Sequence, residues 1–243
     1  MASLRSGRPV PELVEDLVVA NRILYQQGVV DGFGHISVRH DKDKSRFLMS
    51  RSLAPALVTA DDIMEFDLDA NAIDKRDRKV YLERFIHGEI YRARPDVRCV
   101  VHSHSPTVVP FGVSATPLRP LAQVSGFLGL GVPVFEIRKF NDGCDFLISD
   151  AGLGKALAQV LGDKAVVLMR GHGSTAVGNT LRQAVWRAIY TEVNARQQVV
   201  AMLLGPVIYL NPEESRYAAD NVPQDPDRAW NLWKHKALSD PKC

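Results

Sequence analysis

The sequence predicts a globular protein built from both helices and strands, which alternate along its 243 residues. Apolar residues recur at helical spacing over 12–27, 80–93, 150–161 and 180–204. Short apolar or alternating stretches typical of strands cover 31–39, 47–49, 62–68, 99–105, 134–137 and 164–169. Glycine and proline separate these segments, and no linker-like stretch divides the chain.

Composition narrows the functional class. The chain is 46% hydrophobic and 24% charged, with a net charge of +2 and interspersed signs, so we expect neither nucleic acid nor a membrane as a partner. No apolar run approaches about 18–20 residues, and the first twelve residues lack the hydrophobic core of a signal peptide. Three scattered cysteines, Cys99, Cys144 and Cys243, do not make a disulfide framework. A reducing, cytoplasmic location is therefore expected.

The helices have recognisable ends. Pro11 stands at the start of the helix over 12–27, and Gly28 follows its end. The helix over 80–93 is expected to carry Glu83 and His87 on one face, because residues four apart are neighbours there. Thr180 and Gln183 have capping-box spacing and open the helix that Gly205-Pro206 ends.

The strands and turns between them follow from local pattern. A glycine-bearing turn opens the strand over 31–39, and residues 69–71 follow the alternating stretch 62–68 as a hairpin turn. Prolines between 106 and 133 break the chain into short pieces. The tail over 211–243 holds a short helix with Trp230 and Trp233, which we expect to dock on the body or on a neighbouring subunit.

Three histidines and one glutamate form a candidate metal site. His102 and His104 lie at the end of an apolar strand, where residues two apart share a face with Cα atoms about 6.5–7 Å apart. A second apolar strand ends in the glycine-flanked His172. Glu83 lies upstream on a predicted helix that runs into the first of these strands. Three imidazole ligands suit Zn²⁺, Mn²⁺, Fe²⁺ or Co²⁺, so we expect one such divalent ion per subunit.

These residues belong to a run of motifs that resembles a known family, the class II aldolase/adducin head superfamily, over about residues 12–210. The motifs are Gly34-x-x-Ser37-x-Arg39, Glu83-x-x-x-His87-x-x-x-Tyr91, Arg94-Pro95-Asp96, His102-x-His104 and Arg170-Gly171-His172-Gly173. The resemblance implies an α/β fold, a three-layer α/β/α domain with a central, largely antiparallel sheet, spanning residues 1–243. It also implies a homotetramer with active sites near subunit interfaces.

The resemblance also implies roles for individual residues. His102, His104 and His172 would bind the metal, and Glu83 would act as acid or base. His87 is expected to be a buried support for the site rather than a fourth ligand.

The positions that cradle phosphate in the sugar-phosphate aldolases differ here. They read Gly34-His35, Ser50-Arg51-Ser52 and Tyr81-Leu82, where a phosphate cradle needs small residues. The replacements resemble the family branch that decarboxylates hydroxylated aromatic or pyridine dicarboxylates. Arg51 then becomes a candidate anchor for a carboxylate, with a solvated loop arginine as the alternative, and Ser50, Ser52 and Tyr81 become candidate substrate contacts.

The predicted function is a metal-dependent lyase that decarboxylates such an acid through a metal-stabilised enolate or oxyanion. Either Glu83 or His35 supplies the proton. The alternatives are a class II aldolase acting on a non-phosphorylated hydroxy-keto substrate, a dehydratase or epimerase acting on a sugar derivative, and a non-enzymatic adducin-type head.

Overall fold

In the computed structural model, which describes residues 7–141 and 145–239, the described strands form one sheet in the order β3-β2-β1-β4-β7-β6-β5. The strands are β1 (His35–Arg39), β2 (Arg46–Ser50), β3 (Ile63–Asp67), β4 (Cys99–Ser103), β5 (Val134–Phe135), β6 (Val166–Met169) and β7 (Gly173–Gly178). Neighbouring strands pair antiparallel except β5 and β6, which are parallel. The largely antiparallel sheet is confirmed.

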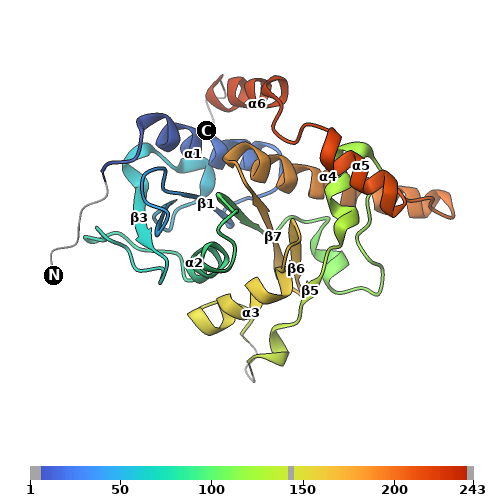
Figure 1. Ribbon diagram of the computed structural model, residues 1–243, viewed down its shortest axis with the longest axis horizontal. Helices are drawn as coiled ribbons and strands as arrows, with labels where there is room; N and C mark the ends of the chain where they lie inside the picture. The colour runs from blue at the N-terminus through green and yellow to red at the C-terminus, as the bar shows by residue number, and fades with distance from the viewer. Residues whose placement is uncertain (1–6, 142–144, 240–243) are drawn as a thin grey trace.

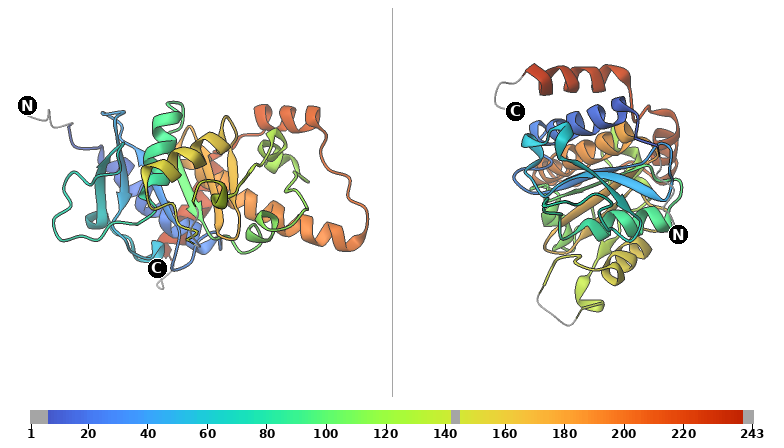
Figure 2. Two further views of the ribbon diagram at one scale, coloured as in Figure 1. Left: turned by 90° about the horizontal axis from the view of Figure 1, so that it is seen from below. Right: turned by 90° about the vertical axis from the view of Figure 1, so that its left-hand side faces the viewer.

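Helices cover both faces of this sheet (Figure 1, Figure 2). Those on one face are α1 (Pro11–Gln26) and α4 (Leu181–Leu204), and those on the other are α2 (Arg84–Ala93) and α3 (Ala151–Leu161). The alternation of a strand explains the division, because successive side chains point to opposite faces. In β4, Val101 packs in the cluster with α1 and α4, whereas Val100 packs in the cluster with α2 and α3. The three-layer α/β/α arrangement is confirmed.

One central strand was not predicted. β7 lies between β4 and β6, and all six of its residues are buried, yet its sequence Gly-Ser-Thr-Ala-Val-Gly lacks a run of large apolar side chains. A Cβ atom on Gly173 would lie 2.2 Å from the carbonyl oxygen of Ser103, so the chain needs small residues here for close packing. Periodicity of large hydrophobic residues cannot reveal such a strand.

The helix predicted over 80–93 begins later, at Arg84. Glu83 is its N-cap, with φ −86° and ψ 17°, so Glu83 does not lie on a helix face with His87 as expected. The preceding segment is held along the loop after β2 instead. The backbone N–H of Ser52 donates to the carbonyl of Lys79, and the Tyr81 hydroxyl lies within hydrogen-bond distance of Leu53. These tertiary contacts override the helical spacing.

The C-terminal segment forms α5 (Pro212–Asn221), which was not predicted, and α6 (Asp227–Ser239). In α6, Trp230 is buried, and the Lys234 ammonium lies 3.0 Å from the Asp16 carboxylate of α1. In the described part of this segment, α6 thus packs outside α1 (Figure 2), and α5 packs on residues 123–130 of the same chain. Within the described ranges, no helix is long and apolar enough to cross a membrane. Cys99 is buried and free, whereas Cys144 and Cys243 lie outside the described residues.

The contact between α2 and α3 depends on a glycine. A Cβ atom on Gly154 of α3 would lie 2.6 Å from the carbonyl oxygen of Phe85 in α2. We expect Gly154→Ala to destabilise the fold by about 1–3 kcal/mol, because the helices must separate. Denaturant unfolding measures this. The exposed neighbour Lys155 is the control, since Lys155→Ala should change stability by no more than about 0.5 kcal/mol. Equal effects of the two substitutions would contradict the packing argument.

Candidate metal centre

Four side chains that the sequence singled out converge at one end of the central strands β4 and β7. Their ligand atoms, from Glu83, His102, His104 and His172, all lie within 4.8 Å of one another. The Nε2 atom of His104 lies 3.2 Å from that of His102 and 2.9 Å from that of His172. One carboxylate oxygen of Glu83 lies 3.4 Å from Nε2 of His102 and 3.4 Å from Nε2 of His172.

This donor set fits a divalent cation. Ligand atoms at about 2.0–2.1 Å from a tetrahedral ion are separated by about 3.3 Å, close to the nitrogen–nitrogen distances here. The Nδ1 atom of His172 lies 2.9 Å from the carbonyl oxygen of Phe146, so in the neutral ring Nδ1 donates there and Nε2 presents a lone pair to the cluster. The lone pair that His172 presents to the cluster favours a cation there.

The sheet brings these histidines together. His102 is in β4 and His104 lies just beyond its end, whereas His172 lies in the turn that joins β6 to β7. Because β4 pairs antiparallel with β7, the end of β4 lies beside the start of β7. Gly171 makes the turn possible with a φ of 66°, a conformation that favours glycine.

The segment 146–148 orients two of the four groups through its backbone. The carbonyl of Phe146 accepts from His172, and the N–H of Ile148 donates to the other carboxylate oxygen of Glu83 at 3.1 Å. Sequence reasoning missed this segment. Its contacts come from backbone groups, so no residue pattern marks them.

The electrostatics of the cluster follow from burial and proximity. Burial alone would raise the pKa of Glu83, but His102 and His172 outweigh it and hold that pKa well below its usual range. Burial also opposes charge on His172, yet its contacts with Glu83 raise the pKa of His172. For His104, burial and the neighbouring imidazoles lower the pKa to about 4. The Glu83 carboxylate is thus ionised in the free protein. A general acid that starts out protonated would instead need a raised pKa.

His35 lies beside the cluster, since it pairs with His102 across β1 and β4. Its ring centroid is 5.0 Å from that of His102 and 4.7 Å from that of Tyr81. Burial, followed by the charges of His87 and His102, lowers the pKa of His35. Nδ1 of His35 lies 2.7 Å from Nε2 of the fully buried His87.

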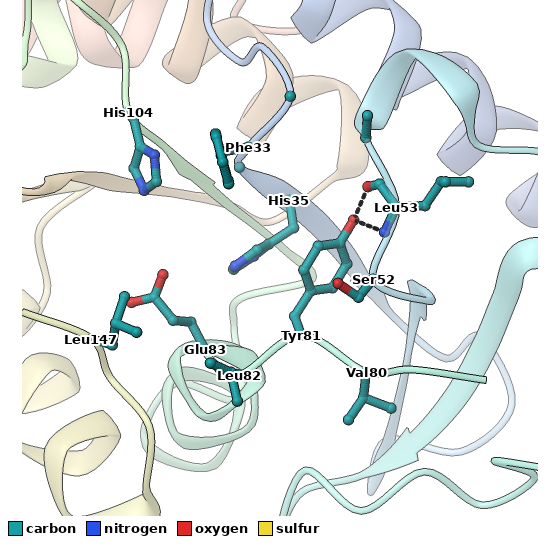
Figure 3. A pocket seen from close by; sticks show the side chains of 13 residues that line it. Phe33, His35, Ser52, Leu53, Val80, Tyr81, Leu82, Glu83, His104 and Leu147 are labelled. Atoms are coloured by element: carbon teal, nitrogen blue, oxygen red, sulfur yellow. Dashed lines mark hydrogen bonds between the residues drawn. The ribbon is translucent and has the colours of Figure 1, made fainter. Parts of the chain in front are cut away.

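A cavity of about 430 Å³ opens next to these groups (Figure 3). Its apolar walls include Phe33, Leu53, Leu147 and the ring of Tyr81, whose hydroxyl donates to the Leu53 carbonyl at 2.5 Å. Of these walls, Phe33, Leu53 and Leu147 were not predicted. The chemical groups that face the cavity are His35, Ser52, Glu83 and His104.

The structure does not bring every predicted substrate contact to the cavity. Ser52 and Tyr81 line it, whereas the buried Ser50 contacts the Tyr81 hydroxyl at 3.2 Å and is not in the wall. Arg51 does not line it either, and its Nε donates to the Asp62 carboxylate at 2.5 Å.

Known proteins share this fold and much of this sequence. The decarboxylase tropJ of Talaromyces stipitatus is 41% identical over a 244-residue alignment that covers 90% of this chain and 92% of that protein. The 3,4-dihydroxyphthalate decarboxylase of Arthrobacter keyseri is 32% identical over 196 residues, 74% of this chain and 75% of that protein.

Among solved structures, the L-fuculose 1-phosphate aldolase from Glaciozyma antarctica superposes with a TM-score of 0.74 at 26% identity, covering 93% of this chain and 87% of that one. The family model described as class II aldolase and adducin N-terminal domain matches residues 15–199. The chain therefore belongs to the class II aldolase and adducin N-terminal domain family.

Proposed function

We propose that this protein is a metal-dependent decarboxylase of a hydroxylated aromatic or pyridine dicarboxylic acid. The observation that carries the proposal is a cavity in which apolar walls meet two members of the clustered donor set, Glu83 and His104. Flat walls such as Phe33 and Tyr81 suit a ring. The decarboxylase names of the relatives support the reaction class.

The positions that cradle phosphate in the sugar-phosphate aldolases hold larger side chains here, which argues against a sugar phosphate as substrate. Tyr81 places an aromatic ring in the cavity and its hydroxyl takes up backbone groups of Leu53, so these groups cannot cradle a phosphate. A planar carboxylate substrate needs no such cradle.

We propose that His102, His104 and His172 hold one divalent ion. Three imidazole ligands suit Zn²⁺ or Mn²⁺, and also Fe²⁺ or Co²⁺. Such an ion supplies Lewis-acid stabilisation of negative charge on a substrate oxygen.

Glu83 moves the proton. Its carboxylate takes the proton of the ring hydroxyl and delivers it to the ring carbon that bears the carboxylate. The bond to that carboxylate then breaks, CO₂ leaves, and the electron pair restores the aromatic ring.

Arg51 is our candidate for meeting the second carboxylate, because it directly precedes Ser52 in the wall of the cavity. Its Nε is held by Asp62, which orients the guanidinium, and its Nη groups have no hydrogen-bond partner in the described part of the chain. The edge formed by the two Nη groups is then free to bind a carboxylate through two parallel hydrogen bonds. Ser52, the next residue, lines the cavity and supports this position.

Removal of any one ligand histidine should strip the metal. We expect His102→Ala, His104→Ala and His172→Ala each to lose bound divalent ion and turnover, because two imidazoles hold it far less tightly. Elemental analysis of the purified variants measures the occupancy. His235→Ala on the exposed surface of α6 is the matched control and should keep the metal. Full occupancy in all three ligand variants would exclude this site.

Substrate turnover tests the reaction itself. We expect CO₂ release from a panel of hydroxylated aromatic and pyridine dicarboxylates, with Glu83→Gln lowering kcat by about 10²–10⁴-fold while metal is retained. Release of an aldehyde from hydroxy-keto compounds, or of water from sugar derivatives, would instead support an aldolase or a dehydratase. A kcat of Glu83→Gln within a few-fold of the parent would remove Glu83 from the proton-transfer role.

We also propose a homotetramer with active sites near the subunit interfaces. The C-terminal end of α4 extends beyond the sheet (Figure 2), and it borders a groove of about 330 Å³ that includes Phe111. Phe33 and Leu82 at the cavity are 69% and 62% exposed, which suits a neighbouring subunit there. Large apolar side chains exposed at and after the end of α4 are Val199, Val200, Met202, Leu203, Leu204 and Ile208.

Charge on this helix end should break the assembly. Light scattering of the parent protein should give four times the 26.9 kDa chain mass, and the double variant Leu203→Glu, Leu204→Glu should give a smaller species, because buried carboxylates cannot replace apolar contacts. Leu232→Glu on α6, where Leu232 is 52% exposed, is the control and should leave the mass unchanged. A monomeric parent would refute the tetramer.

A further inference from the structure

A chain of hydrogen bonds runs from the buried core to the cavity. The Tyr91 hydroxyl lies 2.8 Å from Oγ of Ser37, and this oxygen lies 2.6 Å from Nδ1 of His87. Nε2 of His87 then lies 2.7 Å from Nδ1 of His35. Tyr91, Ser37 and His87 are fully or almost fully buried, whereas His35 lines the cavity. Figure 3 shows the His35 ring projecting toward Glu83.

All four groups are buried, and within the described residues no carboxylate oxygen lies within 4.0 Å of a ring nitrogen of His35 or His87, so the neutral form of each group is favoured. In agreement, burial, with a smaller effect of His102, lowers the pKa of His87 to about 3, and burial raises the pKa of Tyr91 well above its ordinary value. The four neutral groups carry four hydrogens between them, but the chain has three links. One hydrogen is therefore left over, and it belongs to Tyr91, Ser37 or His35.

The two ends are not equivalent. If every hydrogen bond points toward Tyr91, the spare hydrogen is that of the Tyr91 hydroxyl, which has no other acceptor within the residues that the structure describes. If Ser37 instead accepts from both Tyr91 and His87, the spare hydrogen is that of the Ser37 hydroxyl, which likewise has no other acceptor among the described residues. An unpaired donor in the core is strongly disfavoured in both cases. If the bonds point the other way, Tyr91 donates to Ser37, Ser37 to His87 and His87 to His35. The spare hydrogen is then on Nε2 of His35, where water or substrate accepts it.

We propose that Tyr91, Ser37 and His87 are positioning residues that fix His35 as the neutral tautomer with hydrogen on Nε2. His35 is then a fixed hydrogen-bond donor to an anionic oxygen of the substrate. It is not a base, because Nε2 holds a hydrogen and Nδ1 is occupied by His87. This deepens the proposed function, on which the role toward substrate rests, and leaves Glu83 as the group that carries the proton.

The tautomer is measured without substrate. In the zinc-loaded protein labelled with ¹⁵N in its histidine rings, His35 should show a protonated Nε2 and an unprotonated, hydrogen-bonded Nδ1, with its resonances assigned by their loss in His35→Asn. Hydrogen on Nδ1 would overturn the proposal. Because no turnover is involved, this result is independent of whether the protein is a decarboxylase.

Two near-isosteric replacements of His87 test the direction of the chain. The amide of His87→Gln can donate to Nδ1 of His35 and should preserve the tautomer, whereas the carboxylate of His87→Glu accepts there and should move hydrogen to Nδ1. We expect kcat/KM for CO₂ release to fall about 10- to 100-fold in His87→Glu relative to His87→Gln. Equal tautomers and equal rates in both variants would overturn the proposal.

A neutral replacement covers the case in which a buried carboxylate prevents folding. His87→Leu removes the donor without adding charge, so the Nδ1 resonance of His35 should shift toward that of an imidazole nitrogen without a hydrogen bond. Tyr91→Phe removes only the far end of the chain. It should leave hydrogen on Nε2, because a reversed chain would now leave the hydrogen of the Ser37 hydroxyl without an acceptor among the described core residues. An unchanged Nδ1 resonance in His87→Leu, or hydrogen on Nδ1 in Tyr91→Phe, would overturn the proposal.

Discussion

The antiparallel pairing of β4 with β7 is the constraint on which the site depends. It places the end of one strand beside the start of the other, so His104 and His172, which are 68 residues apart in sequence, approach to 2.9 Å. The approach requires a strand of small residues, since Gly173 leaves no room for a Cβ atom beside Ser103. A bound cation would favour this geometry, because it attracts the lone pair of each imidazole nitrogen that faces it.

The sequence predicted the layers of the fold well where large apolar residues repeat. The helices α1, α3 and α4 lie within one or two residues of their expected bounds, because their ends carry recognisable signals such as Pro11 and the Thr180 cap. β7 was missed because close packing selected glycine, serine and alanine there. The helix over 80–93 was extended too far, because the contact between Tyr81 and Leu53 acts across the chain and leaves no local pattern.

The convergence of the four candidate ligands was predictable from the sequence, but the contacts that support them were not. His-x-His at a strand end and a glycine-flanked histidine have a spacing that chemistry demands, so His102, His104 and His172 were found together with Glu83. The hydrogen bonds that orient these side chains were not predicted. Neither the Phe146 carbonyl nor the link from Tyr91 through Ser37 to His87 can be inferred from residue types, because each depends on which strand or helix comes to lie opposite.

The segment from Phe146 to Ile148 separates two tasks that active sites often combine. Its backbone orients His172 and Glu83, while the side chain of Leu147, between those two contacts, forms part of the cavity wall. A change of residue at position 147 therefore reshapes the space offered to a substrate and leaves the backbone contacts of the reactive groups in place. Within such a family, new substrate ranges can evolve at this position by single mutations without first losing the chemistry.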